Sequence, residues 1–465
     1  MDKKYKCDRV ENLAVDKTEE LLYGVAPKPV TCGHGLILGG GKIYPEINFT
    51  LPTMIISEQN WSEVLQQYRE MLNGITERAV ELEVPGLVVE FEQLPPMTLN
   101  PEWGAEITAI IREILDQNYE RHGLRSVLRV TPVDIRDKLR PPLMRSGQYL
   151  ETMLKSFELG AKNGADLLAI ESTGGKEIHD DALMNADLQG IIFALGVLAP
   201  RDVYFLWDKI SEIANSCNII ASGDTACGFA NTAMILADKR MIPAVLAAII
   251  RVISTVRTLQ AHFAGAVGPT KDCAYEGPYI KAITGVPISM EGKSSACAHL
   301  SPIGNITAAC ADLWSNESVN NVRLLSGYAP VVSLEQLIYD CRLMNVVAAS
   351  GREDALRMRN WLVESDIHHD PQAYVLSPEV VIDISRQLIK YSQPYEMALA
   401  AADLTLKTLR EANAKKELNL PPLELKWLDI LAGQFDCIPD NESGMLEQIN
   451  SGNYSNKFIA QEYSL

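Results

Sequence analysis

Residues 264–281, with the sequence AGAVGPTKDCAYEGPYIK, hold the pattern that decides the fold of this chain. A short run of small apolar residues breaks at a Gly-Pro turn, and Cys273 then stands before a stretch that we expect to be helical. Two other segments have the same layout: LLAIESTGGKE, whose strand should end at Glu171, and NIIASGDTACG, whose strand should end at Cys227. Each is typical of a buried strand that turns into a helix. Each also places a potential metal ligand at the turn.

Strand and helix patterns alternate on both sides of these segments. The expected strands cover residues 86–92, 126–133, 165–172, 218–222, 264–267, 286–292 and 322–325. Helical periodicity fills the sequence between them, as in residues 61–84, where apolar residues form one stripe. Short, mostly apolar strands separated by helices predict a parallel sheet covered by helices, either a barrel or a doubly wound sheet. No GxGxxG motif opens a helix after the first expected strand, so we predict an α/β fold of the TIM (β/α)8 barrel type.

The same patterns divide the chain into three parts. Residues 1–58 should form an N-terminal arm and a hairpin-like extension, and residues 59–350 should form the barrel. After residue 351 the strand signals stop, and residues 351–465 should form a helical region packed on the barrel, suited to oligomerisation or partner docking. The GGGK sequence at 39–42 lacks both the first glycine and the final Ser or Thr of a phosphate-binding loop. A hairpin that caps one end of the barrel is therefore the preferred interpretation.

Composition excludes several classes of function. The 465 residues carry a net charge of -18, which argues against a nucleic acid as the main partner, because phosphate neutralisation needs a basic face. The most apolar run, residues 241–256, contains Pro243 and Arg251 and falls short of the ~20 residues that span a bilayer. No apolar segment follows the charged N-terminus as in a signal peptide. We therefore expect a cytoplasmic protein without a membrane partner, whose nine cysteines are not disulfide staples.

Three of the strand ends suggest a metal site. In a barrel the loops after the strands open at one face, where the active site lies, so Glu171, Cys227 and Cys273 should converge there. Two thiolates and a carboxylate suit Zn²⁺, and three protein ligands leave a fourth position open for substrate. The spacing alone leaves an alternative open, in which Glu171 pairs with a basic neighbour and both cysteines are packed in the core.

Further polar residues stand near the same strand ends. Glu90 lies on the expected strand LVVEFE, and Cys297 and His299 stand two apart in KSSACAH; we expect these three to contact substrate. Glu177 and Asp224 flank the predicted ligands and are candidates for a proton donor or for groups that orient the ligands. The structural alternatives are polar filling of the barrel interior, satisfied groups at its rim, and loop caps.

The motifs around these residues resemble the zinc-containing methanol:corrinoid methyltransferases of methanogens and some acetogens. The resemblance runs through ADLLAIESTGGKE, SGDTACGFANTAM, AGAVGPTKDCAYEGPYIKAITGVPISMEGKSSACAH and DLWSNESV. Weaker similarity extends from Asn100 to Asp370. The resemblance implies that the zinc ligands are Glu171, Cys227 and Cys273.

The resemblance also implies an activity. An enzyme of this kind binds methanol at zinc and passes the methyl group to Co(I) of a separate corrinoid protein, a reaction of methanogenesis and one-carbon metabolism. It implies a homo-oligomer within a hetero-oligomeric complex. Ala226 departs from the family pattern, which can carry an acidic residue there, so no acid role is transferred to that position. The alternatives are another methyl donor (a methoxylated aromatic, a methylamine or a thioether) and a non-catalytic, zinc-stabilised assembly subunit.

Overall fold

The computed structural model describes residues 10–51, 54–271, 275–320 and 322–465. The strands are β1 (Val25–Cys32), β2 (Leu36–Gly40), β3 (Tyr44–Thr50), β4 (Leu87–Glu92), β5 (Ser126–Thr131), β6 (Leu167–Ile170), β7 (Ile220–Asp224), β8 (Ser289–Glu291), β9 (Leu313–Val319), β10 (Arg323–Leu324) and β11 (Gly327–Tyr328). The helices of the first half are α1 (Trp61–Glu81), α2 (Pro95–Leu99), α3 (Pro101–His122), α4 (Gln148–Lys162), α5 (Lys176–Met184), α6 (Leu188–Phe193), α7 (Ala199–Ser216) and α8 (Thr232–Asp238). Those of the second half are α9 (Ala244–Phe263), α10 (Gly277–Thr284), α11 (Lys293–Ala298), α12 (Ala329–Ser350), α13 (Arg352–Glu364), α14 (Pro371–Tyr374), α15 (Pro378–Leu388), α16 (Pro394–Lys415), α17 (Pro422–Phe435) and α18 (Glu442–Ser451).

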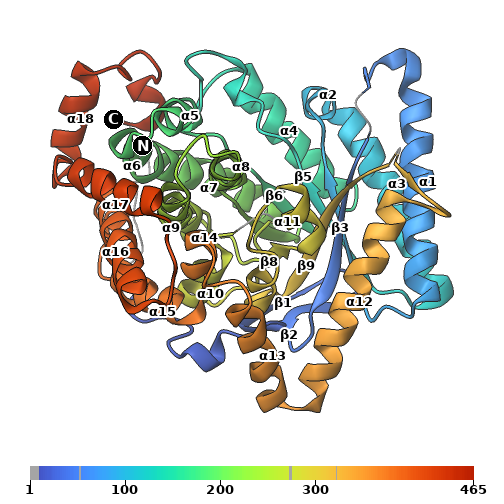
Figure 1. Cartoon of the computed structure of the whole chain (residues 1–465). Helices are drawn as coiled ribbons and strands as arrows, with labels where there is room; N and C mark the ends of the chain where they lie inside the picture. Colours follow the sequence, from blue (N-terminus) through green and yellow to red (C-terminus); the bar gives the residue numbers. More distant parts are fainter. Residues whose placement is uncertain (1–9, 52–53, 272–274, 321) are drawn as a thin grey trace.

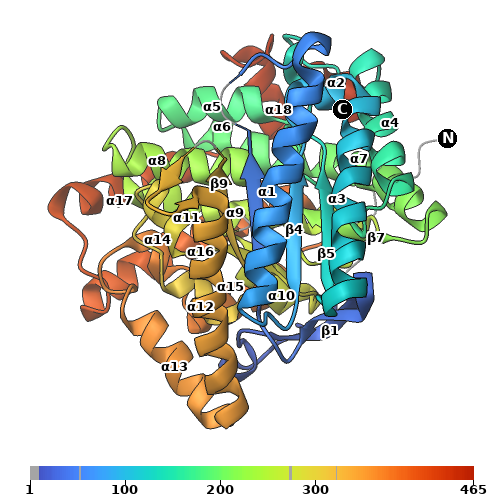
Figure 2. The same ribbon diagram turned by 90° about the vertical axis from the view of Figure 1, so that its right-hand side faces the viewer.

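A curled sheet of parallel strands is the centre of the molecule (Figure 1). Its order is β7-β6-β5-β4-β3-β9-β8, and every neighbouring pair is parallel. Helices cover the outside, with α1, α3 and α12 along the side seen in Figure 2. Outward-facing strand residues such as Ile47, Phe91 and Ile170 are fully buried in the main hydrophobic core. The predicted TIM-barrel-like fold is confirmed.

Residues 264–268 lie in the gap between the two edge strands. The N–H groups of Val267 and Gly268 donate to the carbonyls of Ala221 and Ser222 on β7, at 2.9 and 2.8 Å. A Cβ at Gly268, whose φ is +83°, would lie 2.7 Å from the carbonyl oxygen of Pro287. This segment therefore runs between β7 and the residues that lead into β8. The strand expected at 264–267 is thus a short extended piece paired with β7 alone.

Two sheet strands differ from the sequence prediction. Strand β3 lies within residues 1–58, which we assigned to the extension, and β9 overlaps the helix expected at 306–314. The two are neighbours, paired from Tyr44↔Leu313 to Thr50↔Val319. The expected strand at 322–325 is instead part of the small β10–β11 hairpin. The barrel therefore begins before residue 58.

The interior of the barrel is polar near its middle. Arg129 on β5 is fully buried and donates from Nε to Glu46 Oε1 on β3 at 2.6 Å. It also donates from Nη1 to Ser222 Oγ on β7 at 2.7 Å, and Ser289 on β8 donates to Glu46 as well. These contacts join four strands across the barrel and leave the strand ends above them for the site.

The N-terminal ends of the strands are closed by the antiparallel β1–β2 hairpin. The side chains of Leu36 and Leu38 are buried in a second, smaller core with Val88, Val127 and Leu167. This core plugs the end of the barrel opposite to the predicted site. Ligands must therefore approach from the other end, where the strands finish.

The C-terminal helices pack on the left side of the barrel in Figure 1, where α16 lies against α9. Two helical stretches, Leu188–Ser216 and Ala244–Phe263, are long and apolar enough to cross a membrane, but 83% and 94% of their apolar windows are buried inside the protein. Both stretches are core helices of the fold.

Candidate active site

The structure places two of the three predicted metal ligands on neighbouring loops. Glu171 directly follows β6, and Cys227 follows β7 by three residues. Strands β6 and β7 are parallel neighbours, with Ile170 paired to Asp224, so both side chains leave the sheet at its C-terminal edge. Cys273 lies outside the described residues. The two described positions are where a barrel carries its active site.

Lys271 holds the carboxylates around this edge together. Its Nζ lies 3.1 Å from Glu171 Oε1, 3.2 Å from Glu90 Oε1 and 3.4 Å from Glu92 Oε2. The ammonium group is buried, Glu90 is fully buried, and Glu92 and Glu171 are partly exposed. Thr131 also donates to Glu90 Oε1, at 2.6 Å. Glu90, which we expected to contact substrate, thus lies beside Glu171 as a partner of the same lysine.

Cys227 begins a single π-helical turn, η6 (Cys227–Asn231). Asn231 Nδ2 donates to Cys227 Sγ at 3.1 Å, so the last residue of this turn holds the sulfur of the first. Lys176, at the start of α5, reaches the next residue and donates to the carbonyl of Gly228 at 3.1 Å. The first turn of α5 therefore adjoins the Cys227 loop.

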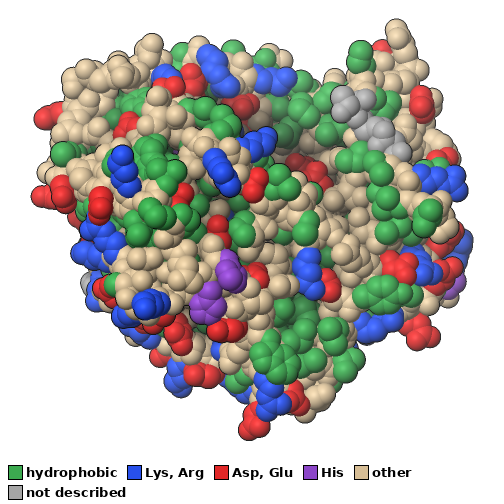
Figure 3. Space-filling model, viewed as in Figure 1, with side chains coloured by type: hydrophobic (Ala, Val, Ile, Leu, Met, Phe, Trp, Pro, Cys, Tyr) green, Lys and Arg blue, Asp and Glu red, His purple; other side chains and the backbone are tan. Residues whose placement is uncertain are grey.

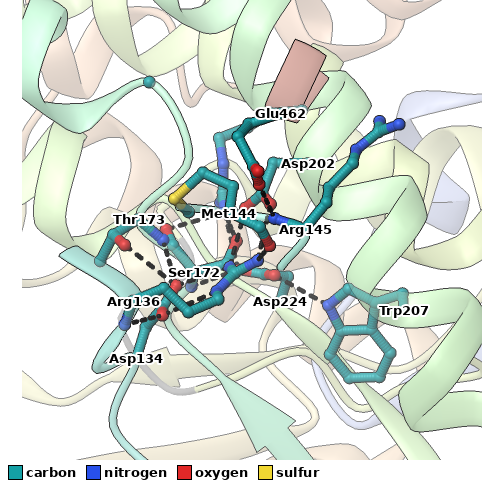
Figure 4. Close-up of polar contacts among 12 residues, drawn as sticks. Asp134, Arg136, Met144, Arg145, Ser172, Thr173, Asp202, Trp207, Asp224 and Glu462 are labelled. Atoms are coloured by element: carbon teal, nitrogen blue, oxygen red, sulfur yellow. Dashed lines mark hydrogen bonds and ion pairs between the residues drawn. The ribbon is translucent and has the colours of Figure 1, made fainter. Parts of the chain in front are cut away.

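Asp224 is buried below the two loops and does not face solvent. Its Oδ1 accepts from the backbone N–H of Ser172 at 3.2 Å and from Arg257 Nη2 at 2.8 Å, while its Oδ2 accepts from Trp207 Nε1 at 2.8 Å. Figure 4 shows Trp207 and Ser172 turned toward this carboxylate. Of the two roles expected for Asp224, this environment fits the orientation of the ligand loops.

The loop after Glu171 is held from its other side by a buried ion cluster (Figure 4). Arg136 pairs with Asp134 and Asp202, both at 2.7 Å, and Asp134 Oδ2 accepts from the N–H of Thr173 at 2.9 Å. Burial opposes ionisation of Asp134, but the charge and hydrogen bonds of Arg136 outweigh it and hold its pKa below the usual value. Burial raises the pKa of Asp202 despite the same guanidinium. The cluster fixes the backbone two residues beyond Glu171.

Glu177, the other predicted proton donor, lies in the first turn of α5. Its carboxylate is partly exposed and lies 3.6 Å from Arg140 Nε. Its Oε2 is buried without a hydrogen-bond partner among the described residues. The neighbouring Lys176 contacts the Cys227 loop, while the oxygen of Glu177 that makes no hydrogen bond is the one that faces Arg140.

Cys297 and His299 lie on another side of the strand ends, after β8. His299 is partly exposed, and its Nδ1 is 3.3 Å from Glu291 Oε2 at the end of β8. Tyr275 donates to the same carboxylate oxygen at 2.5 Å. Cys297 is an exposed free cysteine on α11. The described contacts connect neither residue to Glu171 or Cys227.

Three residues of this site were not singled out from the sequence: Lys271, Arg257 and Glu276. Glu276 is fully buried, and its Oε1 accepts from the N–H of Ala226, next to Cys227, at 2.8 Å. Of the three, only Lys271 could have been suspected from the sequence, because a charged residue there follows an apolar strand end. The other two act through partners that are distant in sequence, which no local pattern reveals.

Glu171 and Cys227 could supply part of the coordination sphere of a zinc ion. A carboxylate and a sulfur on adjacent loops are two of the ligands that catalytic zinc uses. The described residues contain no group of three side chains that could hold a metal, and the third predicted ligand is outside them.

Acidic side chains show in the hollow near the upper centre of Figure 3, while Lys and Arg are interspersed with Asp and Glu elsewhere on that face.

Comparison with known proteins identifies the family. Residues 7–464 match the model of the methanol-cobalamin methyltransferase B subunit. The chain belongs to this family. It is 35% identical over 437 residues, 93% of its length and 94% of the relative's, to the methanol–corrinoid protein co-methyltransferase of Methanosarcina barkeri (strain Fusaro / DSM 804). It also superposes with a TM-score of 0.93 on a chain of the methanol:cobalamin methyltransferase complex MtaBC from Methanosarcina barkeri, at 33% identity, covering 98% of this chain and 100% of that one.

Membership of the methanol-cobalamin methyltransferase B-subunit family confirms the resemblance and makes the chain a methyltransferase. The superposition spans the N-terminal hairpin, the barrel and the C-terminal helices together, because 98% of the chain is covered. The name of the first relative contains a corrinoid protein, and that of the complex contains cobalamin, which is a corrinoid, so the acceptor of this family is a corrinoid protein.

Proposed function

We propose that this protein transfers the methyl group of methanol to Co(I) of a separate corrinoid protein, with zinc held by Glu171, Cys227 and Cys273. The observation that carries the proposal is the placement of Glu171 and Cys227 on adjacent strand ends of a chain that is 35% identical to a methanol–corrinoid protein co-methyltransferase. Methanol and one proton enter, the C–O bond breaks, cobalt supplies the electron pair of the new Co–C bond, and water leaves.

Bound zinc would act as a Lewis acid toward the methanol oxygen and stabilise the negative charge that develops on it. The protein's own residues prepare the site for this. Lys271 fixes the direction of the Glu171 carboxylate through the 3.1 Å contact. Glu90 and Glu92 hold the ammonium from its other side, so that Lys271 stays in place when Glu171 binds a metal.

A proton must reach the leaving oxygen, because hydroxide is a poor leaving group. We assign this role to Glu177, whose helix begins beside the Cys227 loop and whose buried Oε2 makes no hydrogen bond among the described residues and faces Arg140 at 3.6 Å. Asp224 is assigned to positioning, since Arg257, Trp207 and Ser172 already donate to its oxygens. Glu177→Gln should lower the methyl-transfer rate about 10²-fold or more and leave the zinc content at one per chain. Asp224→Asn should reduce both.

The decisive experiment mixes the reduced protein, loaded with zinc, with its reduced corrinoid partner and follows the methyl-cobalt absorbance after methanol is added. We expect a signal with methanol and none with Glu171→Gln or Cys273→Ala, which should also lose zinc. A signal only with a methoxylated aromatic, a methylamine or a thioether would reassign the donor. A full zinc equivalent in Cys273→Ala would contradict the ligand assignment.

The same proposal includes the setting of the reaction. The protein acts in the cytoplasm, in methanogenic or related one-carbon metabolism, as a homo-oligomer within a larger complex with the corrinoid protein. Native mass spectrometry of the purified pair tests this assembly, and a 1:1 complex of single chains would contradict it.

A further inference from the structure

Helix α9 is buried along nearly its whole length, yet it carries polar side chains into the region below the ligand loops. Burying such groups costs free energy unless they find hydrogen-bond partners. Two consecutive residues, Arg257 and Thr258, are both fully buried. Apart from the contact between these two residues, their hydrogen-bond partners lie on, or directly beside, the stretches that carry the predicted metal ligands.

Arg257 joins the first two loops. Its Nη2 donates to Ser172 Oγ at 2.5 Å, to the Ser172 carbonyl at 3.3 Å and to Asp224 Oδ1 at 2.8 Å. Ser172 directly follows Glu171, and Asp224 is the last residue of β7, three positions before Cys227. One guanidinium therefore fixes the distance between the strand ends that carry Glu171 and Cys227.

Thr258 joins the second loop to the third. Its hydroxyl donates to Glu276 Oε1 at 2.6 Å, and the same oxygen accepts from the N–H of Ala226 at 2.8 Å. Ala226 directly precedes Cys227, and Glu276 comes three positions after Cys273 in the sequence. The hydroxyl thus orients a buried carboxylate that bridges the two cysteine-bearing stretches.

We propose that Arg257 and Thr258 are positioning residues that set the relative placement of the loops after β6 and β7 and of Glu276, at the start of α10, before any metal binds. This inference rests on the proposed function, because it takes Glu171, Cys227 and Cys273 as the ligands. A rigid helix that fixes these segments removes conformational freedom which the metal would otherwise have to restrict. The metal affinity should therefore depend on contacts that never touch the metal.

The test compares three variants of one helix. Thr258→Val removes the hydroxyl that orients Glu276, and Thr258→Ser keeps it. Thr255→Val is the matched control: Thr255 is equally buried on α9, and its hydroxyl has no hydrogen-bond partner among the described residues. The measurements are the zinc dissociation constant, from competition with a chelator under reducing conditions, and the melting temperature of the metal-free protein.

We expect Thr258→Val to weaken zinc binding about 10- to 100-fold, the usual cost of losing a contact behind a metal ligand. Thr258→Ser and Thr255→Val should stay within about threefold of the wild type. The metal-free Thr258→Val protein should melt below the Thr255→Val protein, because the buried Glu276 carboxylate loses a donor, so the zinc affinities are compared at a temperature where both variants are fully folded. Arg257→Lys should also weaken zinc binding, because an ammonium group cannot reproduce the planar guanidinium that contacts both Ser172 and Asp224.

Two results would overturn the inference while leaving the proposed function intact. In the first, Thr258→Val binds zinc as tightly as the wild type. In the second, Thr255→Val loses as much affinity as Thr258→Val, which would mean that any buried change in α9 has the same effect. A wild-type protein that binds no zinc would overturn the proposed function and the inference together.

Discussion

Lys271 illustrates how single residues balance charge in this site. Three carboxylates share one buried ammonium group, which lies within 3.4 Å of each of them. Removing the cation would break its 3.2 Å pair with the fully buried Glu90, and breaking a buried pair costs more than the pair itself contributes. The stability of the strand ends therefore depends on this lysine.

Lys271→Met should lower the free energy of unfolding by roughly 3 kcal/mol or more. Urea unfolding of the metal-free protein measures the change. Adding Glu90→Gln to the same chain removes the buried negative charge, so the double variant should recover part of the lost free energy of unfolding. A single variant that unfolds like the wild type would show that Glu90 is neutral in the folded protein.

His179 on α5 predicts a pH effect at a single residue. It is fully buried, its ring meets Phe229 edge-on, and burial lowers its pKa below the ordinary value in spite of Asp180 beside it. Below pH ~6.5 the unfolded chain takes up a proton that the folded chain refuses, so stability falls as the pH falls, by up to ~1.4 kcal/mol per pH unit. His179→Gln should flatten this decline between pH 7.5 and 5.5, as measured by urea unfolding.

The matched control is His122→Gln, at an exposed position near the end of α3. That variant should retain the pH profile of the wild type. If His179→Gln and the wild type lose the same stability over this range, the acid sensitivity comes from other groups.

At the scale of elements, substitutions in the β1–β2 hairpin test whether its buried leucines stabilise the N-terminal end of the barrel. Leu38 is fully buried in the small core at the N-terminal strand ends, and its neighbour Ile37 is 46% exposed. Leu38→Ala should cost about 2–5 kcal/mol, because the surrounding strands cannot collapse into the space. Ile37→Ala should cost less than ~1 kcal/mol. Equal losses in urea unfolding would mean that the hairpin is fixed by its backbone rather than by the plug.

The two strands that the sequence did not reveal, β3 and β9, contain fewer consecutive apolar residues than β6. Strand β6 reads LLAI and is apolar on both faces, which is the expected pattern for a buried parallel strand. Strands β3 and β9 turn Glu46, Asn48 and Ser315 into the barrel, where Arg129 and Ser289 satisfy Glu46. The sequences of β3 and β9, YPEINFT and LWSNESV, resemble those of partly exposed segments. Only contacts with residues distant in sequence show that these strands belong to the barrel.

The candidate site shows the same division. The break from strand to helix located Glu171 and Cys227 without a structure, since a turn after a buried strand has a local pattern. The contacts of Arg257 with Ser172 and of Lys271 with Glu90 join residues 85 and 181 positions apart (257 − 172 and 271 − 90). The residues next to Arg257 and Lys271 in the sequence give no indication of these distant partners.

At the scale of the whole molecule, the C-terminal region is joined to the barrel through its most buried helix. Arg251 on α9 is fully buried and donates from Nη2 to Gln372 Oε1 at 2.7 Å. The N–H of Val245, at the start of the same helix, donates to Glu424 Oε2 at 3.0 Å. Tyr463, in the last turn of the chain, accepts from the N–H of Gly175 at 3.2 Å. Residues 351–465 therefore support the helix that positions the ligand loops and the loop after Glu171.

Removing residues 351–465 should consequently unfold the barrel rather than release a stable domain. The fragment 1–350 would expose the apolar face of α9 that α16 covers and leave Arg251 without Gln372, and a buried cation without its partner is strongly destabilising. The intact chain should unfold in one calorimetric transition, whereas the fragment should show none and should bind a hydrophobic dye. Supplying residues 351–465 as a separate chain during refolding should restore part of the transition. A fragment that melts cooperatively near the temperature of the intact protein would contradict this coupling and would make the barrel an independent folding unit.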